Sequence, residues 1–439
     1  MGEVATGLVL FTRDLRVHDQ PALAMATRSF ARVVPLFVLD PALMGSANRV
    51  RFLLQALADL DSSLHSLGSR LIVRSGDPAT VAVTVAREAG AAAIWLSADV
   101  SAYAKARERR LRDRGAGIEV RLFPGVTVVP PGEVLPAGGD HFKVFTPYHR
   151  AWRLATWRRT VAAPQRLGEV ADVQSEHPPE LPRAASSELP DGGESAGRAR
   201  MQEWLEGGLH RYAELHDDLP GDGTSRLSPY LHFGCISPLE LATSALSAGG
   251  EAFVRQLCWR DFHHQVLNAV PSASSQDYRP RGGWRHDPAV LAAWKAGRTG
   301  IPIVDAGMRQ LSREGWMHNR ARLLVASLLT KNLGIDWRDG AAHFQELLVD
   351  GDYANNSMNW QWVAGTGNDT RPNRVFNPIR QAQRFDPNGD YVRRYLTELA
   401  SVEGAAVHEP WLLEPLIRRS LDYPEPIVAP SLRRRSAFP

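Results

Sequence analysis

Small hydroxyl side chains gather in one short segment just before a proline. Residues 223–229 read GTSRLSP. Hydroxyls and free backbone N–H groups bind phosphate, and Pro229 suits the first turn of a helix, where unpaired N–H groups attract anions. The segment predicts a phosphate-binding loop, although Ser and Thr also cap helices in proteins of every kind.

A second segment combines aromatic, amide and guanidinium groups. Residues 316–333 begin WMHNRAR and show the apolar period of a helix. On that helix Trp316 and Arg320 would lie four residues apart, and Asn319 and Arg322 three apart, so that each pair shares a face. Such a surface could bind a flipped base, but a solvated helix face has a similar composition.

Carboxylates and amides precede two indoles further along the chain. Residues 350–362 read DGDYANNSMNWQW. This is not a calcium loop, because Asn355 stands at the sixth position, where glycine is required. The neighbours His263 and His264 do not make a zinc site either, since no ligand follows at the i+4 spacing. We expect no metal, and the mixture of amides, carboxylates and indoles suits a flavin.

The elements that must position these groups begin with an α/β pattern. The apolar runs that read as buried parallel strands are residues 7–11, 33–39, 70–74, 93–96 and 119–123. Between them, leucines from Leu53 to Leu67 repeat at helical spacing. We predict a doubly wound parallel-sheet domain over residues 1–130. Its first strand is not followed by G-x-G-x-x-G, which argues against a flavin oxidoreductase that uses NAD(P)H.

Helical patterns dominate the rest of the chain. We expect an interdomain linker over residues 131–200, because its second half is rich in Pro, Glu, Ser and Gly and lacks an apolar period. A mainly helical domain follows over residues 201–439, and it holds nine of the 12 tryptophans. The main cofactor therefore belongs in this second domain.

Composition limits the class of protein. The net charge is only +3, so any nucleic-acid site must be a local patch. Two cysteines, Cys235 and Cys258, are too few for a disulfide framework and fit a reducing cytoplasm. No run approaches the roughly 18 apolar residues of a membrane span. We expect a cytoplasmic monomer that does not associate with membranes.

Taken together, these segments resemble the DNA photolyase and cryptochrome family, from Phe11 to about Leu399. Residues 13–19 (RDLRVHD) and 36–40 (LFVLD) resemble its opening motifs. The similarity to class I cyclobutane pyrimidine dimer photolyases implies that the helical domain binds FAD and that the partner is DNA containing pyrimidine dimers. Light-excited, reduced FAD would give an electron to a dimer that has been flipped out of the helix.

The resemblance also implies roles for individual residues. The FAD-binding residues would be Tyr212, Thr224, Ser225, Arg226, Leu227, Ser228, Arg260, Asn319, Arg322, Asp350, Asp352 and Asn356. Among them Arg322 would pair with Asp350, and Asn356 would face the flavin N5. The electron-carrying indoles would be Trp284, Trp337 and Trp360. The contacts to the dimer and to DNA phosphate would come from Gln256, Trp259, Asn319, Arg320 and Trp362.

Two positions depart from the cyclobutane-specific pattern. Gln256 replaces a glutamate and Leu323 replaces a methionine, and a glutamine cannot supply a proton to the dimer. Asn319 favours cyclobutane dimers, since enzymes for (6-4) photoproducts carry histidine there. The alternatives are repair of another ultraviolet photoproduct and a cryptochrome-type light sensor without repair. The short tail, with Arg433 to Arg435, lacks a long signalling extension.

An antenna pigment is expected in the first domain, at Arg13 and Asp99. Residues 97–101 (SADVS) resemble the 8-hydroxydeazaflavin type of site. The alternative, methenyltetrahydrofolate, would be accompanied by a nearby Asn and Glu and by a lysine near residue 271, and the chain has neither pattern. We therefore expect an 8-hydroxydeazaflavin antenna.

Overall fold

The computed structural model describes residues 5–168 and 173–428. Residues 169–172 of the predicted linker and the run from Arg433 to Arg435 lie outside the described residues. The chain divides into two compact units. Unit 1 comprises Met1–Ala184, Pro190–His210 and Ser225–Pro271, and unit 2 comprises Ala185–Leu189, Arg211–Thr224 and Ser272–Pro439.

Five parallel strands form the sheet of unit 1, in the order β3-β2-β1-β4-β5. Their bounds are β1 Thr6–Phe11, β2 Arg32–Leu39, β3 Ile72–Ser75, β4 Ala91–Ser97 and β5 Glu119–Phe123. Leu10 of β1 pairs with Leu36 on one side and Leu96 on the other. Strands β1, β2 and β4 are almost entirely buried, which explains their continuous apolar sequences. The predicted doubly wound sheet is confirmed, with every strand within two residues of its expected bounds.

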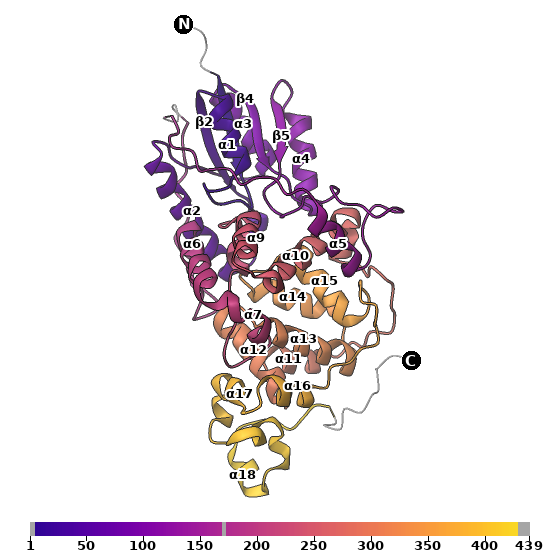
Figure 1. Cartoon of the computed structure of the whole chain (residues 1–439). Coiled ribbons are helices and arrows are strands. Elements are labelled where there is room, and N and C mark those ends of the chain that lie inside the picture. The colour runs from indigo at the N-terminus through magenta and orange to yellow at the C-terminus, as the bar shows by residue number, and fades with distance from the viewer. Residues whose placement is uncertain (1–4, 169–172, 429–439) are drawn as a thin grey trace. The chain divides into compact units, whose positions relative to one another are not determined.

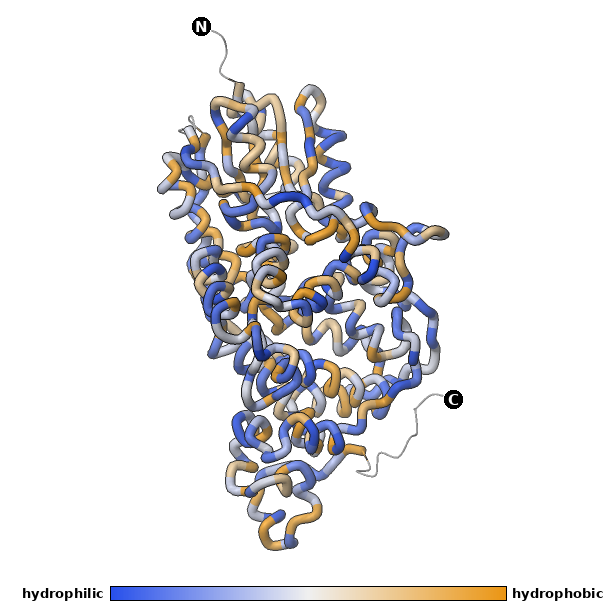
Figure 2. The backbone as a smooth tube through the Cα atoms, in the orientation of Figure 1, coloured by the Kyte–Doolittle hydropathy of each residue, from blue (hydrophilic) through white to orange (hydrophobic). Residues whose placement is uncertain are grey.

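Nine helices accompany the sheet in the described part of unit 1. They are α1 Pro21–Ser29, α2 Ala47–Ser66, α3 Pro78–Glu88, α4 Ala102–Arg114, α5 Phe145–Leu154, α6 Glu194–Glu203, α8 Ser228–Phe233, α9 Pro238–Ser247 and α10 Glu251–Ala269. Helix α1 packs on β1 and β4, while α3 and α4 pack together (Figure 1). Figure 2 shows α4 as mostly hydrophilic, in keeping with its arginine-rich sequence. Helix α5 and the start of α6 fall within the range that we expected as linker.

Unit 2 is helical, as the second part of the chain was predicted to be. Its helices are α7 Tyr212–Leu215, α11 Pro288–Lys295, α12 Pro302–Glu314, α13 Asn319–Ser327, α14 Trp337–Leu347, α15 Tyr353–Ala364, α16 Pro378–Phe385, α17 Asp390–Tyr395 and α18 Pro415–Ser420. A π-helical turn, Leu328–Asn332, continues α13. One hydrophobic core joins α11 to α15 and includes the buried Trp294, Trp337 and Trp360. Within the described ranges, the helices are all too short or too polar to cross a membrane.

Candidate functional site

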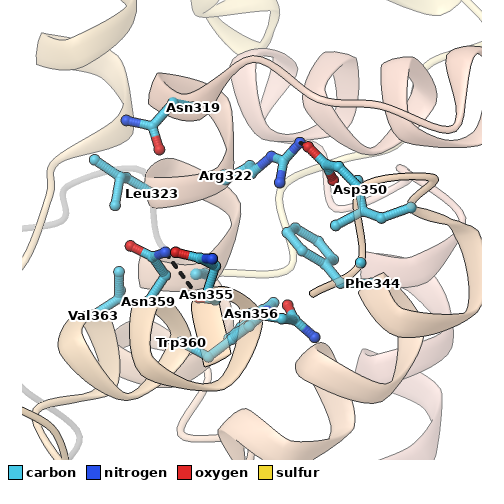
Figure 3. A pocket seen from close by; sticks show the side chains of 13 residues that line it. Asn319, Arg322, Leu323, Phe344, Asp350, Asn355, Asn356, Asn359, Trp360 and Val363 are labelled. Carbon is cyan, nitrogen blue, oxygen red and sulfur yellow. Dashed lines mark hydrogen bonds and ion pairs between the residues drawn. The ribbon is translucent and has the colours of Figure 1, made fainter. Parts of the chain in front are cut away.

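A cavity opens in unit 2 between α13, α14 and α15 (Figure 3). Phe344 and Trp360 form apolar parts of its wall. Four amide side chains face it from α13 and α15, namely Asn319, Asn355, Asn356 and Asn359. The cavity therefore combines flat apolar surfaces with many groups that can both donate and accept hydrogen bonds.

An ion pair forms the polar end of this cavity. Arg322 Nη2 lies 2.8 Å from Asp350 Oδ2, and Arg322 Nε donates to the main-chain oxygen of Met317. The guanidinium is thereby held by two charge-assisted bonds. Asp350 is buried, and its Oδ1 has no hydrogen-bond partner among the described residues. A buried carboxylate oxygen without a partner marks a place for a hydrogen-bond donor. The structure thus brings together the predicted pair Arg322 and Asp350.

The start of α13 differs from the sequence-based expectation. The helix begins at Asn319, because the side chain of His318 accepts the N–H of Arg320, and Gln310 Oε1 accepts the N–H of His318. Trp316 therefore precedes the helix, and the predicted pairing of Trp316 with Arg320 on one helix face is wrong. Asn319 and Arg322 were expected to share one face of the helix, and this is confirmed, since both belong to α13 and line the cavity.

Helix α15, which carries Asn355, Asn356, Asn359 and Trp360, is fixed at its first residue. Asp352 is its N-cap and accepts from both the N–H and the side chain of Asn355. An N-cap carboxylate is also stabilised by the positive end of the helix dipole. Asp352 does not line the cavity, whereas Asn356, expected beside the flavin N5, does.

The carboxyl end of α15 is held by two cations, the buried Lys331 and the half-buried Arg281. Lys331 Nζ donates to the main-chain oxygens of Ala364 at 2.8 Å and Pro372 at 2.6 Å, and Arg281 Nη1 reaches the same two oxygens. Burial and the charge of Arg281 lower the pKa of Lys331 to about 8. Positive groups suit the last carbonyls of a helix, so both ends of α15 are anchored.

The predicted electron-carrying indoles share one hydrophobic core. Trp337 and Trp360 are buried in it, and Trp284 packs against it. Trp337 Nε1 donates to Asp277 at 2.8 Å. Trp360 lies directly against Gly340 of α14, where an added Cβ would come within 2.2 Å of its ring. Glycine at position 340 is therefore what lets Trp360 approach α14.

Two of the predicted DNA contacts of unit 2, Arg320 and Trp362, already have protein partners. Arg320 makes two hydrogen bonds to Asp217, at 3.0 and 2.6 Å, and its guanidinium lies 4.4 Å from the centre of the Phe385 ring. The ring of Trp362 stacks on Phe376 and lies under Arg374. A phosphate bound at Arg320 would compete with Asp217, a contact that the sequence pattern did not indicate.

Helix α10 presents a second group of predicted residues, in unit 1. Gln256 is exposed, and Trp259 is half-buried and stacks on Phe145 with ring centres 3.7 Å apart. Arg260 Nη1 donates to the main-chain oxygen of Val126 at 2.6 Å.

A buried carboxylate fixes α10 within unit 1. Asp261 Oδ2 accepts from the N–H groups of Val128 and Val129 and from Trp152 Nε1. Burial raises the pKa of Asp261 to about 6, although Arg260 and these hydrogen bonds oppose the shift.

The predicted phosphate-binding loop contains a residue with a left-handed backbone conformation. Arg226 adopts a left-handed conformation with φ 52°, which is uncommon for a residue with a side chain and is often found at functional sites. The N–H of Leu227 donates to Ser225 Oγ, and α8 begins at Ser228 with Pro229 in its first turn, as predicted. Tyr212 and Thr224 belong to unit 2, at the start of α7 and in the segment that follows it.

The expected antenna residues meet where the strand order of the sheet reverses. Arg13 follows β1 and Asp99 follows β4, and their side chains pair at 3.3 Å. Ligands of doubly wound sheets bind at this edge, beside the carboxyl ends of the strands. Burial would raise the pKa of Asp99, but the charges of Arg13, Arg107 and His264 hold it below its usual value.

Arg107, which was not expected at this site, lies near the same edge and close enough to Asp99 to affect its charge. It is buried, and its Nε and Nη2 have no hydrogen-bond partner among the described residues. A guanidinium with unused buried donors suits an acceptor on a ligand. Arg107 is one of several arginines along α4, so the pattern gave no signal that would have singled it out.

Comparison with known proteins confirms the resemblance to this family. Residues 253–438 match the FAD binding domain of DNA photolyase, and residues 7–166 match DNA photolyase. A deoxyribodipyrimidine photo-lyase of Streptomyces griseus is 54% identical and covers 97% of this chain and 96% of its own length. A class III photolyase of Agrobacterium tumefaciens superposes with a TM-score of 0.89 at 32% identity, covering 98% of this chain and 95% of that one. A Synechocystis cryptochrome superposes with a TM-score of 0.91 at 31% identity, covering 98% of both chains. The chain therefore belongs to the DNA photolyase family.

Proposed function

We propose that this protein is a deoxyribodipyrimidine photo-lyase that uses FAD and light to split cyclobutane pyrimidine dimers in DNA. The observation that carries the proposal is the cavity of unit 2, which gathers Asn319, Arg322, Asp350, Asn356 and Trp360. The similarity in sequence to the Streptomyces griseus photo-lyase supports the choice of lesion.

The residues of the cavity fit a flavin ring. The unpartnered Asp350 Oδ1 and the amides can hydrogen-bond the polar edge of such a ring, while Trp360 and Phe344 suit its flat faces. When bound, FAD supplies light-driven one-electron chemistry to the site. Arg322 and Asp350 hold each other beside the ring, Asp352 fixes α15, and Asn356 offers its amide to the ring nitrogens. The phosphates belong at Tyr212, residues 224–228 and Arg260.

The remaining proposed roles concern the lesion and the supply of electrons. Aromatic side chains accept a flipped base by stacking, and amides hydrogen-bond its edge. We assign stacking contacts with the dimer to Trp259 and Trp362 and polar contacts to Gln256 and Asn319. Arg320 contacts a DNA phosphate after it leaves Asp217. The indoles Trp284, Trp337 and Trp360 would supply electrons to a bound flavin.

The decisive experiment compares light and dark on one substrate. The purified chain, reduced by light, is mixed with dimer-containing DNA, and recovery of intact thymine is followed by absorbance. We expect recovery under blue light and none in the dark. A matched D350N sample should lose recovery in proportion to its loss of FAD. Failure of the flavin-loaded chain to restore thymine in the light would overturn the proposal.

A light-sensing function is the second candidate. The close superposition on the Synechocystis cryptochrome favours it, because a sensor can share the cavity and the indoles without repairing DNA. Repair of a different ultraviolet photoproduct is tested by the same assay with that lesion in the DNA. A flavin-loaded chain that is inactive on both lesions but changes colour in light would be assigned as a sensor.

We also propose an antenna site in unit 1, at Arg13, Asp99 and Arg107. An acidic 8-hydroxydeazaflavin suits a site with two guanidinium groups, and methenyltetrahydrofolate is the alternative. Expression in a host that makes deazaflavins, followed by extraction of the bound pigment, tests this assignment. A D99N variant should lose the pigment but keep FAD. Recovery of a folate instead would overturn the choice.

Finally, we propose a functional division into residues 1–130 as antenna domain, 131–200 as linker and 201–439 as FAD-binding domain. We also propose that the protein is a monomer in the cytoplasm. The two cysteines, Cys235 and Cys258, are buried free thiols, which suits a reducing compartment. Sedimentation of the flavin-loaded chain tests the monomer.

A further inference from the structure

The amide of Asn356 belongs to a short chain of hydrogen bonds that starts from the backbone. Asn356 Nδ2 donates to the main-chain oxygen of Ala341 at 3.0 Å and to Gln345 Oε1 at 3.3 Å. Gln345 Nε2 in turn donates to the main-chain oxygen of Gly351 at 2.8 Å. Two amides, one from α15 and one from α14, are thus linked and fixed to two carbonyl groups.

This arrangement determines which way each amide points. A main-chain carbonyl oxygen can only accept, so the NH₂ group of Gln345 must face Gly351 and its Oε1 must face Asn356. Turning the amide of Asn356 would set its Oδ1 against the oxygens of Ala341 and Gln345, which are both acceptors. The orientation of Asn356 therefore follows from the backbone in two ways, directly through Ala341 and indirectly through Gln345.

The consequence for the cavity is an acceptor at a defined place. Asn356 lines the cavity (Figure 3), and its Nδ2 is used by Ala341 and Gln345, whereas its Oδ1 accepts no hydrogen bond from the described residues. Gln345 does not line the cavity. It can therefore affect a bound group only indirectly, through Asn356 or through Gly351, the two cavity-lining residues that it contacts.

We propose that Gln345 is a positioning residue, which keeps Asn356 Oδ1 turned toward the cavity to accept a hydrogen bond from the protonated N5 of reduced FAD. The inference rests on the proposed function, because it requires a flavin in this cavity. The N5 of oxidised flavin carries no proton and would instead need a donor. A fixed Oδ1 thus favours the reduced form, which the proposed repair reaction uses.

Three variants test this role by the ratio of reduced to oxidised FAD at a fixed potential. In Q345L the amide of Asn356 keeps only Ala341 as an acceptor and is held less firmly, so the ratio should fall roughly 3- to 10-fold, as expected for one hydrogen bond. In Q345E the carboxylate still accepts from Asn356, but it must take up a proton to donate to Gly351, so the ratio should become dependent on pH. Q383L, at an exposed glutamine of α16, should leave the ratio unchanged.

A second measurement needs no flavin. In protein labelled with ¹⁵N-asparagine, the side-chain NH₂ signals of Asn356 are identified by their loss in N356A. They should move in Q345L and stay in place in Q383L. Unmoved Asn356 signals, or a ratio in Q345L equal to that of the wild type, would overturn the inference. A wild-type chain that binds no FAD would overturn the proposed function instead, and this is seen before any variant is made.

Discussion

Arg322 Nη2 and Asp350 Oδ2 are 2.8 Å apart at the polar end of the cavity, with the side chain of Asp350 almost completely buried. In D350N the shape is kept but the charge that holds Arg322 is lost. A hydrogen bond between charged groups contributes about 1.5–3 kcal/mol, so we expect FAD to bind roughly 10- to 100-fold more weakly. Flavin absorbance retained after dialysis measures this. The exposed Asp422 provides the control D422N, and equal FAD retention by D350N and D422N would contradict the prediction.

Gly340 leaves room for the ring of Trp360, so G340A should disturb both stability and the indole. The added Cβ would lie 2.2 Å from the ring, which forces α14 or Trp360 to move. Overpacking of this kind costs about 1–3 kcal/mol of unfolding free energy. Urea unfolding and the rate of flavin photoreduction are the measurements. G282A is the matched control, because no atom lies within 4 Å of the Cβ position there. If G340A had the same unfolding free energy and the same photoreduction rate as the wild type, the close contact between residue 340 and the ring of Trp360 would be contradicted.

Asp217 neutralises Arg320, and D217N should release that charge for DNA. The cation–π contact with Phe385 would keep the guanidinium in place. We expect tighter binding to undamaged DNA, with a slope of log K against log salt that is steeper by about one. The neighbouring D218N makes the same change in charge without touching Arg320. If both variants bind DNA equally, the effect is one of net charge and the assignment of Arg320 fails.

Asp261 should make the stability of the protein depend on pH in the acid range. Its pKa is raised from 3.8 to about 6 by burial, so the folded chain takes up a proton that the unfolded chain does not. The unfolding free energy should therefore fall by about 2 to 3 kcal/mol as pH rises from about 4 to 6. In D261N this fall in unfolding free energy between about pH 4 and 6 should be absent. Urea midpoints measured across that range would contradict the prediction if the two proteins gave parallel curves.

The sequence predicts those parts of the protein whose cause is local. Buried parallel strands are continuous apolar runs, so β1 and β2 were found within one residue of their observed bounds. The bounds of β5 were also found, but the expectation that it is buried was wrong, because only Phe123 of this strand at the edge of the sheet is buried. Asn356 and Trp360 lie four residues apart in one segment whose mixture of amides and indoles suggested a flavin, and one helix presents both to the cavity.

What the sequence does not predict depends on partners far along the chain. The start of α13 is decided by Gln310 and His318 rather than by helix propensity, which is why the position of Trp316 was wrong. The ion pair of Arg320 with Asp217 joins residues about one hundred positions apart. No periodicity carries information about such contacts.

Helix α15 is anchored by Asp352 at one end, by Lys331 and Arg281 at the other, and by Trp360 in the hydrophobic core, so its placement does not depend on its exposed side chains. Residues such as Asn359, which points into the cavity from the middle of the helix, can be exchanged without moving the backbone (Figure 3). This makes α15 the natural place to begin if the protein is to be redesigned for synthetic flavin analogues with altered colour.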